Sequence, residues 1–144
     1  MTDEKHILIS LEPRHAENIL SGKKKFEFRS RTMHVDANTT VWIYVKMPVG
    51  AVVGKATIDA SYSLAPSTLW RKFSKESGLT SKEFFEYFQE RSKGFALALS
   101  DAKRIKNPVS LATLRTASSG FQPPQFFTHL PKDGALLAAL CQKK

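Results

Sequence analysis

The ten residues from Gly22 to Arg31 constrain the fold most, because they end a helix and begin a strand. The glycine favours the left-handed turn that commonly closes a helix. Two phenylalanines then alternate with Glu27, Arg29 and Arg31, so a strand would carry the rings on one face and the charges on the other. Two interpretations follow. The stretch is either a solvated strand edge with salt bridges, or one wall of a cleft lined by a fixed lysine, glutamate and arginine.

The spacing within this stretch is that of a known family. Gly22, Lys24, Glu27 and Arg29 fit the pattern G-x-K-x-x-E-x-R directly after a short predicted helix. This pattern resembles the signature of the ASCH domain, a relative of the PUA-like RNA-binding barrels. A motif is a hypothesis until its structural context is known.

Other segments support the same resemblance. Residues 7–11 and 12–21 are similar to the opening strand and first helix of ASCH domains. Residues 94–99 and 123–127 are similar to the closing strand and to a C-terminal segment that contains two prolines. The resemblance covers most of the chain except residues 66–91. It implies an α+β fold, a small and mostly antiparallel PUA-like β-barrel of five or six strands, with the first helix capping one opening.

Length and composition indicate one globular domain over residues 1–144. A chain of 144 residues with 42% hydrophobic and 24% charged residues can bury one sizeable core. No segment approaches the ~18 consecutive apolar residues of a membrane span, and the first residues do not resemble a signal peptide. The single cysteine, Cys141, excludes an internal disulfide and a cysteine-based zinc site. We therefore expect a cytoplasmic protein without membrane contact.

The charge favours a polyanionic partner. The net charge is +9, and residues 91–144 hold nine Lys and Arg against two Asp. Such an excess binds nucleic acid through phosphate contacts and counterion release. We expect RNA as the partner, with DNA as the weaker possibility. The sequence predicts no oligomeric state.

Hydrophobic periodicity predicts the elements of the chain in order. Strands are expected where residues alternate and helices where apolar residues recur every three or four positions. The expected strands are residues 6–11, 23–31, 39–47, 51–63 with a bulge at Gly54, and 94–106. The first expected helix starts at Pro13, and others lie in the insertion over about 66–91. A short helix is expected to start at Pro108 and Ser110 and to run through Leu114. The last spans Ala135 to Cys141, with Asp133 as its cap.

The helical insertion has its own start signals. We expect Ser67 or Thr68 to cap its first helix, and Thr80 or Ser81 to cap its second. Glu83 follows Thr80 by three residues, which is the spacing of a capping box. The aromatic residues of this insertion, which include Phe84, Phe85, Tyr87 and Phe88, are expected to form core rather than a binding surface.

Most standard catalytic sites are missing from the sequence. There is no phosphate-binding glycine loop, no dinucleotide-binding motif, no H-E-x-x-H and no cysteine pair. The four histidines are scattered and are expected to be surface or packed residues. We therefore predict no metal and no cofactor.

The remaining candidates form one set of charged and aromatic residues. Lys and Arg hold phosphates, an aromatic ring stacks an unpaired base, and Glu27 can pair with Arg29 or bind a base edge. The predicted nucleic-acid-binding residues are Lys23, Lys24, Glu27, Arg29, Tyr44, Lys46, Lys103, Arg104 and Lys106. Lys24 and Glu27 are also the predicted catalytic residues. Trp42 is expected to fill the core rather than to stack a base.

The resemblance leaves two classes of function open. The first is a module that binds RNA or a modified nucleotide. The second is a small hydrolase, because some ASCH relatives are metal-free ribonucleases and another branch hydrolyses N4-acetylcytidine. That branch uses a lysine, a threonine and a glutamate. Lys24 matches the lysine, but Glu27 stands in place of the threonine, and Glu83 and Glu86 are glutamate candidates by region only. A catalytic lysine would need a pKa lowered by burial or by nearby cations.

Overall fold

The secondary structure follows the predicted order closely. A computed structural model of the chain describes residues 5–141. Its elements are β1 (His6–Leu11), α1 (Pro13–Leu20), β2 (Phe26–Arg29), β3 (Thr40–Val45), β4 (Ala51–Leu64), α2 (Pro66–Phe73), the 3-10 helix η1 (Ser74–Glu76), α3 (Ser81–Tyr87), β5 (Gly94–Ser110), α4 (Leu111–Ala117), β6 (Phe127–Leu130) and α5 (Ala135–Leu140).

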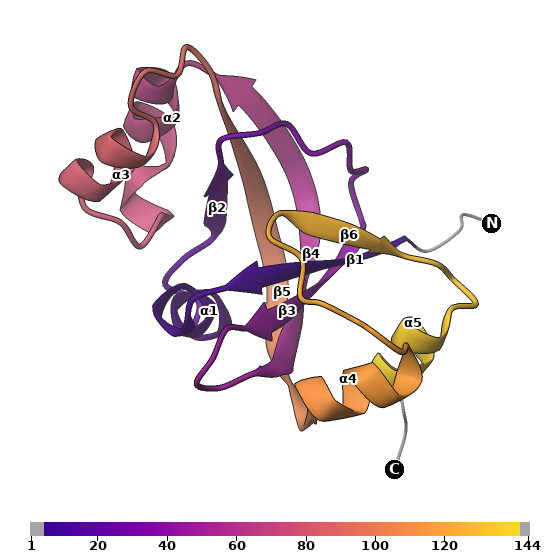
Figure 1. Cartoon of the computed structure of the whole chain (residues 1–144). Coiled ribbons are helices and arrows are strands. Elements are labelled where there is room, and N and C mark those ends of the chain that lie inside the picture. The colour runs from indigo at the N-terminus through magenta and orange to yellow at the C-terminus, as the bar shows by residue number, and fades with distance from the viewer. Residues whose placement is uncertain (1–4, 142–144) are drawn as a thin grey trace.

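The six strands form one curved, mixed sheet in the order β2-β5-β4-β3-β1-β6 (Figure 1). Only β1 and β3 pair in parallel; the other neighbours are antiparallel. The edge strands β2 and β6 do not pair with each other, so the sheet is a half-barrel. Side chains bridge its open side: Arg29 Nη1 donates to the Phe126 carbonyl at 3.4 Å, and the Arg31 guanidinium lies 4.9 Å from the Phe126 ring centre.

Three apolar clusters hold helices to this sheet. The first joins Ala16 and Ile19 of α1 to inward residues of the strands, such as Ile9 and Ile43. The second lies on the other face, where α4 and α5 pack on Trp42 and Tyr44. The third joins the insertion to β2 and β5. Figure 1 shows the insertion and the α4–α5 pair at opposite ends of the molecule.

Gly54 lets α1 pack directly on the sheet. The register between β3 and β4 shifts at this point, which confirms the predicted bulge. A Cβ atom on Gly54 would lie 2.6 Å from Leu20 Cδ2 and 2.7 Å from the Lys103 carbonyl oxygen. Since neither distance is tolerated, only glycine allows the end of α1 to approach β4 this closely.

Part of the aromatic pattern of the insertion forms core as predicted, but the expectation is wrong for Phe85 and Tyr87, which are exposed on α3. Phe84 is fully buried and Phe88 is 3% exposed, and both rings contact Phe28 of β2 edge-on. The capping box between Thr80 and Glu83 is present. The predicted Ser67 or Thr68 cap of the first helix is wrong, because Pro66 occupies the first helical turn and Ala65 is the N-cap. Proline suits that turn since it has no N–H to leave unpaired.

The C-terminal third departs most from the predicted elements. Pro108 lies within β5 rather than at a helix start, and Ser110 alone caps α4. The proline is tolerated because β2 pairs only with residues 95–98, so this part of β5 is an edge. The N-cap of α5 is Gly134 rather than Asp133, and α5 ends before Cys141. Strand β6, which pairs with β1, was not predicted.

Within residues 5–141, no helix is long and apolar enough to cross a membrane.

Candidate active site

A cavity of about 320 Å³ opens between α1, the start of β2 and the helical insertion. Its walls come from five parts of the chain. They include Ser10 and Glu12 near the end of β1, Arg14 and His15 of α1, Lys24, Glu27 and Arg29 of the motif, Lys46 after β3, and Leu79, Glu83 and Tyr87 of the insertion.

The charged residues of the motif form a buried chain along one wall. Lys24 is 2% exposed, and its Nζ donates to the carbonyl of Ser77 and lies 3.7 Å from Glu27 Oε1. The other carboxylate oxygen, Glu27 Oε2, lies 3.3 Å from Arg29 Nε. Glu27 and Arg29 are 7% and 8% exposed, so the interpretation as a solvated strand edge does not hold. The motif lines a cleft.

Backbone contacts explain why Lys24 points inward. Gly22 has φ +89°, which turns the chain sharply after α1. The Lys24 amide then donates to the Asn18 carbonyl at 2.9 Å, and the Lys25 amide donates to the Glu76 carbonyl at 2.7 Å. The turn is thus fixed between α1 and η1. The neighbouring Lys23 and Lys25 side chains are exposed.

Burial changes the acid–base properties of Lys24. Desolvation lowers its pKa below the ordinary value of 10.5, and the negative charge of Glu27 opposes this shift. A lysine whose pKa is lowered gives up its proton more readily than one in water. It can therefore act as a proton donor to a leaving group as well as a cation beside a phosphate.

His15 was not among the predicted site residues, yet it lines the same cavity. The side chain is half-buried, and this burial lowers its pKa below the ordinary value of 6.5. The imidazole is therefore neutral at pH 7. Its Nε2 lies 3.5 Å from Arg14 Nη2, while Nδ1 has no hydrogen-bond partner. The sequence did carry one signal for this position, since His15 precedes the buried Ile19 by four residues on a helix.

Unpaired polar atoms concentrate in this cavity. Four buried side-chain atoms in residues 5–141 have no hydrogen-bond partner, and they are Ser10 Oγ, His15 Nδ1, Arg29 Nη2 and Arg29 Nε, the last of which has only its ion pair with Glu27. All three residues line the cavity. Because more than nine in ten buried polar groups in proteins are hydrogen-bonded, this concentration indicates a site built to bind a polar ligand.

The helical insertion forms the facing wall. Arg14 Nη2 of α1 donates to Glu83 Oε2 of α3 at 2.7 Å across the cavity. This bond lowers the pKa of Glu83 to about 2. The hydroxyl of Tyr87 accepts a hydrogen bond from the Ser30 amide at 3.0 Å. Glu86, the other glutamate considered by region, does not line the cavity.

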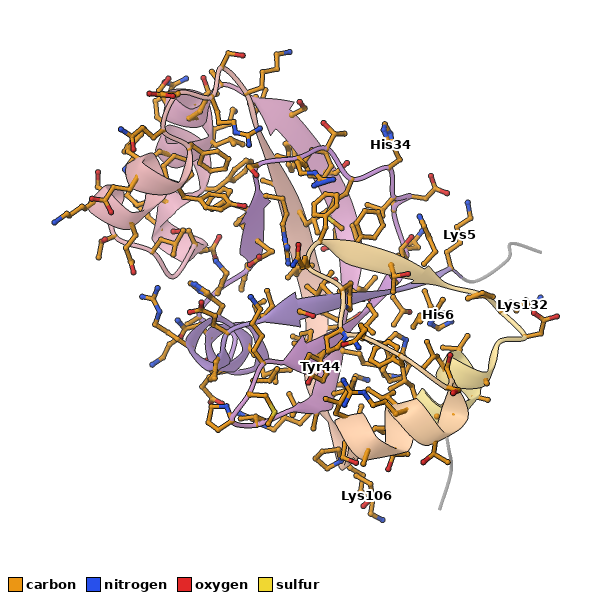
Figure 2. The ribbon with its side chains drawn as sticks, viewed as in Figure 1. Lys5, His6, His34, Tyr44, Lys106 and Lys132 are labelled. Carbon is orange, nitrogen blue, oxygen red and sulfur yellow. The ribbon has the colours of Figure 1, made fainter. Side chains whose placement is uncertain are left out.

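The remaining predicted residues lie elsewhere. Tyr44 is 2% exposed in the cluster beneath α4, and Trp42 is buried beside it, which confirms its core role. Lys103, Arg104 and Lys106 are exposed on β5, where Arg104 bonds to Glu17. Figure 2 shows Lys106 beside α4, far from the insertion. Of the predicted set, the cavity therefore brings together Lys24, Glu27, Arg29 and Lys46.

No group of three or more metal-ligating side chains suited to a metal ion occurs among the described residues.

Comparison with known proteins identifies the family. No model of a protein family matches the chain. An ASCH domain-containing ribonuclease of Zymomonas mobilis is 37% identical over 131 residues, which cover 91% of this chain and 88% of that protein. The chain belongs to the ASCH domain family. Ribosomal protein uL22 of Ureaplasma parvum is 30% identical over 81% of this chain, but only 38% of that protein is covered.

Solved structures agree with this assignment. The crystal structure of ASCH from Zymomonas mobilis has a TM-score of 0.89 and 36% identity, with 96% of this ASCH domain and 94% of that chain covered. Human THYN1, solved in complex with DNA containing 5-methylcytosine, has a TM-score of 0.59 and 9% identity over 98% and 99% of the two chains, a likeness of fold alone. The predicted ASCH and PUA-like α+β architecture is confirmed, as a half-barrel with flanking helices.

Proposed function

We propose that this ASCH domain binds RNA and cleaves its phosphodiester backbone. The observation that carries the proposal is the convergence of Lys24, His15 and Arg29 on one cavity. Together they supply a buried amine of lowered pKa, a neutral imidazole and one guanidinium nitrogen, Arg29 Nη2, that has no partner. The relation to an ASCH domain-containing ribonuclease at 37% identity supports the same assignment.

Arg29 and Lys46 bind the phosphate in this proposal. Arg29 Nη2 has no protein partner, so it can donate to a phosphate oxygen without breaking an existing bond. Lys46 is exposed at the cavity rim and adds a second cation. Glu27 forms ion pairs with Lys24 and Arg29, which hold both side chains in place. Its negative charge partly neutralises their two positive charges in the buried site.

Cleavage then needs two proton transfers. The neutral imidazole of His15 accepts the proton of the ribose 2′-hydroxyl, and the 2′-oxygen forms a bond to phosphorus. The bond from phosphorus to the 5′-oxygen of the next nucleotide breaks, and Lys24 donates a proton to that leaving oxygen. The products are a 2′,3′-cyclic phosphate and a 5′-hydroxyl. Arg29 stabilises the charge that develops on the phosphate oxygens.

RNA beyond the cleaved bond contacts exposed cations of β5 in this proposal. Lys103 and Lys106 are exposed, and no carboxylate within residues 5–141 forms an ion pair with either. Lys103 lies directly opposite Lys55 across the β4–β5 pair. Like charges at such positions destabilise a sheet, and a polyanion relieves their repulsion. The proposed place of action is the cytoplasm.

The test compares the wild type with Lys24→Arg. Guanidinium keeps the positive charge but does not release its proton at ordinary pH. We expect the wild type to cleave labelled single-stranded RNA in the presence of a chelator, and Lys24→Arg to lose at least about 100-fold in rate, as general acids do when removed. DNA of the same sequence should bind without being cleaved, because it lacks the 2′-hydroxyl.

Two outcomes would overturn the proposed reaction. Equal cleavage by wild type and Lys24→Arg would place the activity outside this cavity. Binding without cleavage in the wild type would leave the second candidate, an RNA-binding module, which the charge of +9 favours. N4-acetylcytidine is included as a substrate, because Lys24 and Glu83 both line the cavity and its turnover would identify an amidohydrolase instead.

A further inference from the structure

Tyr87 is unusual among the aromatic residues of the insertion. The residue is 48% exposed, whereas Phe84 of α3 and Phe88, the C-cap of that helix, are buried. It is also an aromatic residue of α3 that lines the cavity. An exposed ring on the wall of a cavity presents a face on which a flat ligand can stack.

The Tyr87 ring is held in place at two points. Its hydroxyl accepts a hydrogen bond from the Ser30 amide at 3.0 Å, directly after β2. Its ring centre lies 4.8 Å from that of Phe88, in an edge-to-face arrangement. The ring therefore connects the insertion to the motif strand and is positioned before any ligand binds. Such a preorganised flat surface is what a stacking contact requires.

The distribution of groups in the cavity matches a single nucleotide. The same cavity carries two cations suited to a phosphate, namely Arg29, whose Nη2 has no partner, and Lys46. An aromatic ring stacks any base because every base has a π-face. A cavity of about 320 Å³ is at the small end of ligand sites and cannot hold a base pair together with its two strands.

We infer that the cavity receives one unpaired nucleotide of RNA, with its base stacked on Tyr87 and its phosphate at Arg29. The inference rests on the proposed function for the identity of the polymer, but it concerns binding rather than cleavage. It assigns the helical insertion a role in recognition. A base in a duplex is already stacked and cannot reach the ring, so this contact requires an unpaired base.

The matched control for Tyr87 is Phe85. Both residues lie on α3, and Phe85 is 41% exposed, close to the value for Tyr87. Phe85 contacts Phe84 and Trp70 edge-on, much as Tyr87 contacts Phe88. The difference is that Phe85 does not line the cavity. Removing either ring should affect folding similarly, whereas only the Tyr87 ring should matter for RNA.

The experiment measures binding of a short 2′-O-methyl RNA, single-stranded or annealed to its complement. This RNA cannot be cleaved through its 2′-oxygen, so affinity is read apart from turnover. We expect Tyr87→Ala to weaken binding of the single strand about 5- to 150-fold. Tyr87→Phe should stay near wild type, Phe85→Ala should change affinity less than about 2-fold, and the wild type should prefer the single strand to the duplex.

Two results would overturn the inference. One is an unchanged affinity in Tyr87→Ala, and the other is equal affinity of the wild type for single strand and duplex. If Tyr87→Ala does not fold, Tyr87→Leu keeps an apolar side chain without a flat ring and is expected to lose the same affinity. A wild type that binds single-stranded RNA but does not cleave it would contradict the proposed reaction and leave this inference standing.

Discussion

Glu27 shows how much the site depends on a single residue. Its carboxylate lies between two buried cations, 3.7 Å from Lys24 Nζ and 3.3 Å from Arg29 Nε. Burying charges is unfavourable unless each is paired. Removing this one carboxylate would leave two cations without an acidic partner in a site closed to most solvent.

We therefore predict that Glu27→Gln lowers the free energy of unfolding by about 3–5 kcal/mol. Glu76→Gln is the matched control, because Glu76 also lies 3.7 Å from a lysine, Lys25, but both side chains are more than half exposed. An exposed pair contributes about 0–1 kcal/mol. Urea denaturation of both variants checks the difference. Equal effects of the two substitutions would contradict a buried role for Glu27.

The pH dependence of cleavage follows from His15 and Lys24. His15 must be neutral to accept a proton, and its pKa lies below 6.5, so the rate should rise with pH through a value below 6.5. Lys24 must be protonated to donate, and its pKa lies below 10.5, so the rate should fall as pH rises through a value below 10.5. The profile is then bell-shaped.

Two further measurements check this assignment. His15→Asn should lose the acid limb of the profile and keep the alkaline limb. The free energy of unfolding should also rise with pH, because His15 binds its proton more tightly in the unfolded state than in the folded state. The wild type should therefore gain stability as pH rises toward 6.5, and His15→Asn should lack that gain. An acid limb that persists in His15→Asn would exclude His15 as the base.

At the scale of elements, the insertion is one wall of the site as well as a packed subdomain. Phe84 contacts Phe28 of β2, with ring centres 4.9 Å apart, and is fully buried. The insertion and the sheet should therefore unfold together. We predict that Phe84→Ala lowers the free energy of unfolding by about 3–5 kcal/mol in a single transition.

Phe85→Ala provides the comparison, since Phe85 is 41% exposed and should cost far less. Fluorescence of the two tryptophans separates the possibilities, because Trp70 lies in the insertion and Trp42 in the sheet. Two transitions, one reported by each tryptophan, would mean that the insertion unfolds independently of the half-barrel.

Elements with strong local signals could be predicted from the sequence, and those set by distant partners could not. The turn at Gly22, the bulge at Gly54 and the capping box at Thr80 each follow from local chemistry. Strand β6 has only four residues, and its pairing with β1 joins segments more than 100 residues apart. Short strands of this kind have no periodicity to distinguish them from a loop.

The same division applies to the site. Lys24, Glu27 and Arg29 are neighbours in sequence, so their spacing indicated a common wall. Tyr87 enters the cavity only because the insertion folds back on β2, where its hydroxyl meets the Ser30 amide. Nothing in the local sequence of α3 separates Tyr87 from Phe85.

For the whole molecule, not all of the cations behind the net charge of +9 are available to bind RNA. Part of it is neutralised locally, since Arg104 pairs with Glu17, Arg14 with Glu83 and Lys5 with Asp36. Other cations meet neutral groups, as Arg115 does with the Phe121 carbonyl and Lys55 with the Trp42 ring. The cations left for RNA therefore include those of the cavity rim and of β5.

This distribution makes the salt dependence of binding a test of where RNA lies. Each phosphate contact should contribute about −0.7 to the slope of log K against log salt for a single strand. We predict that Lys46→Gln and Lys106→Gln each make the slope shallower by about 0.7. Lys5→Gln is the control, because it also removes one positive charge, but Lys5 is paired with Asp36 and lies outside the cavity. The slope for this variant should match that of the wild type. Titration of the 2′-O-methyl single strand at several salt concentrations measures all four slopes. A change in Lys46→Gln alone would confine RNA to the cavity, and equal changes in all three variants would mean that the protein attracts RNA only through its overall charge.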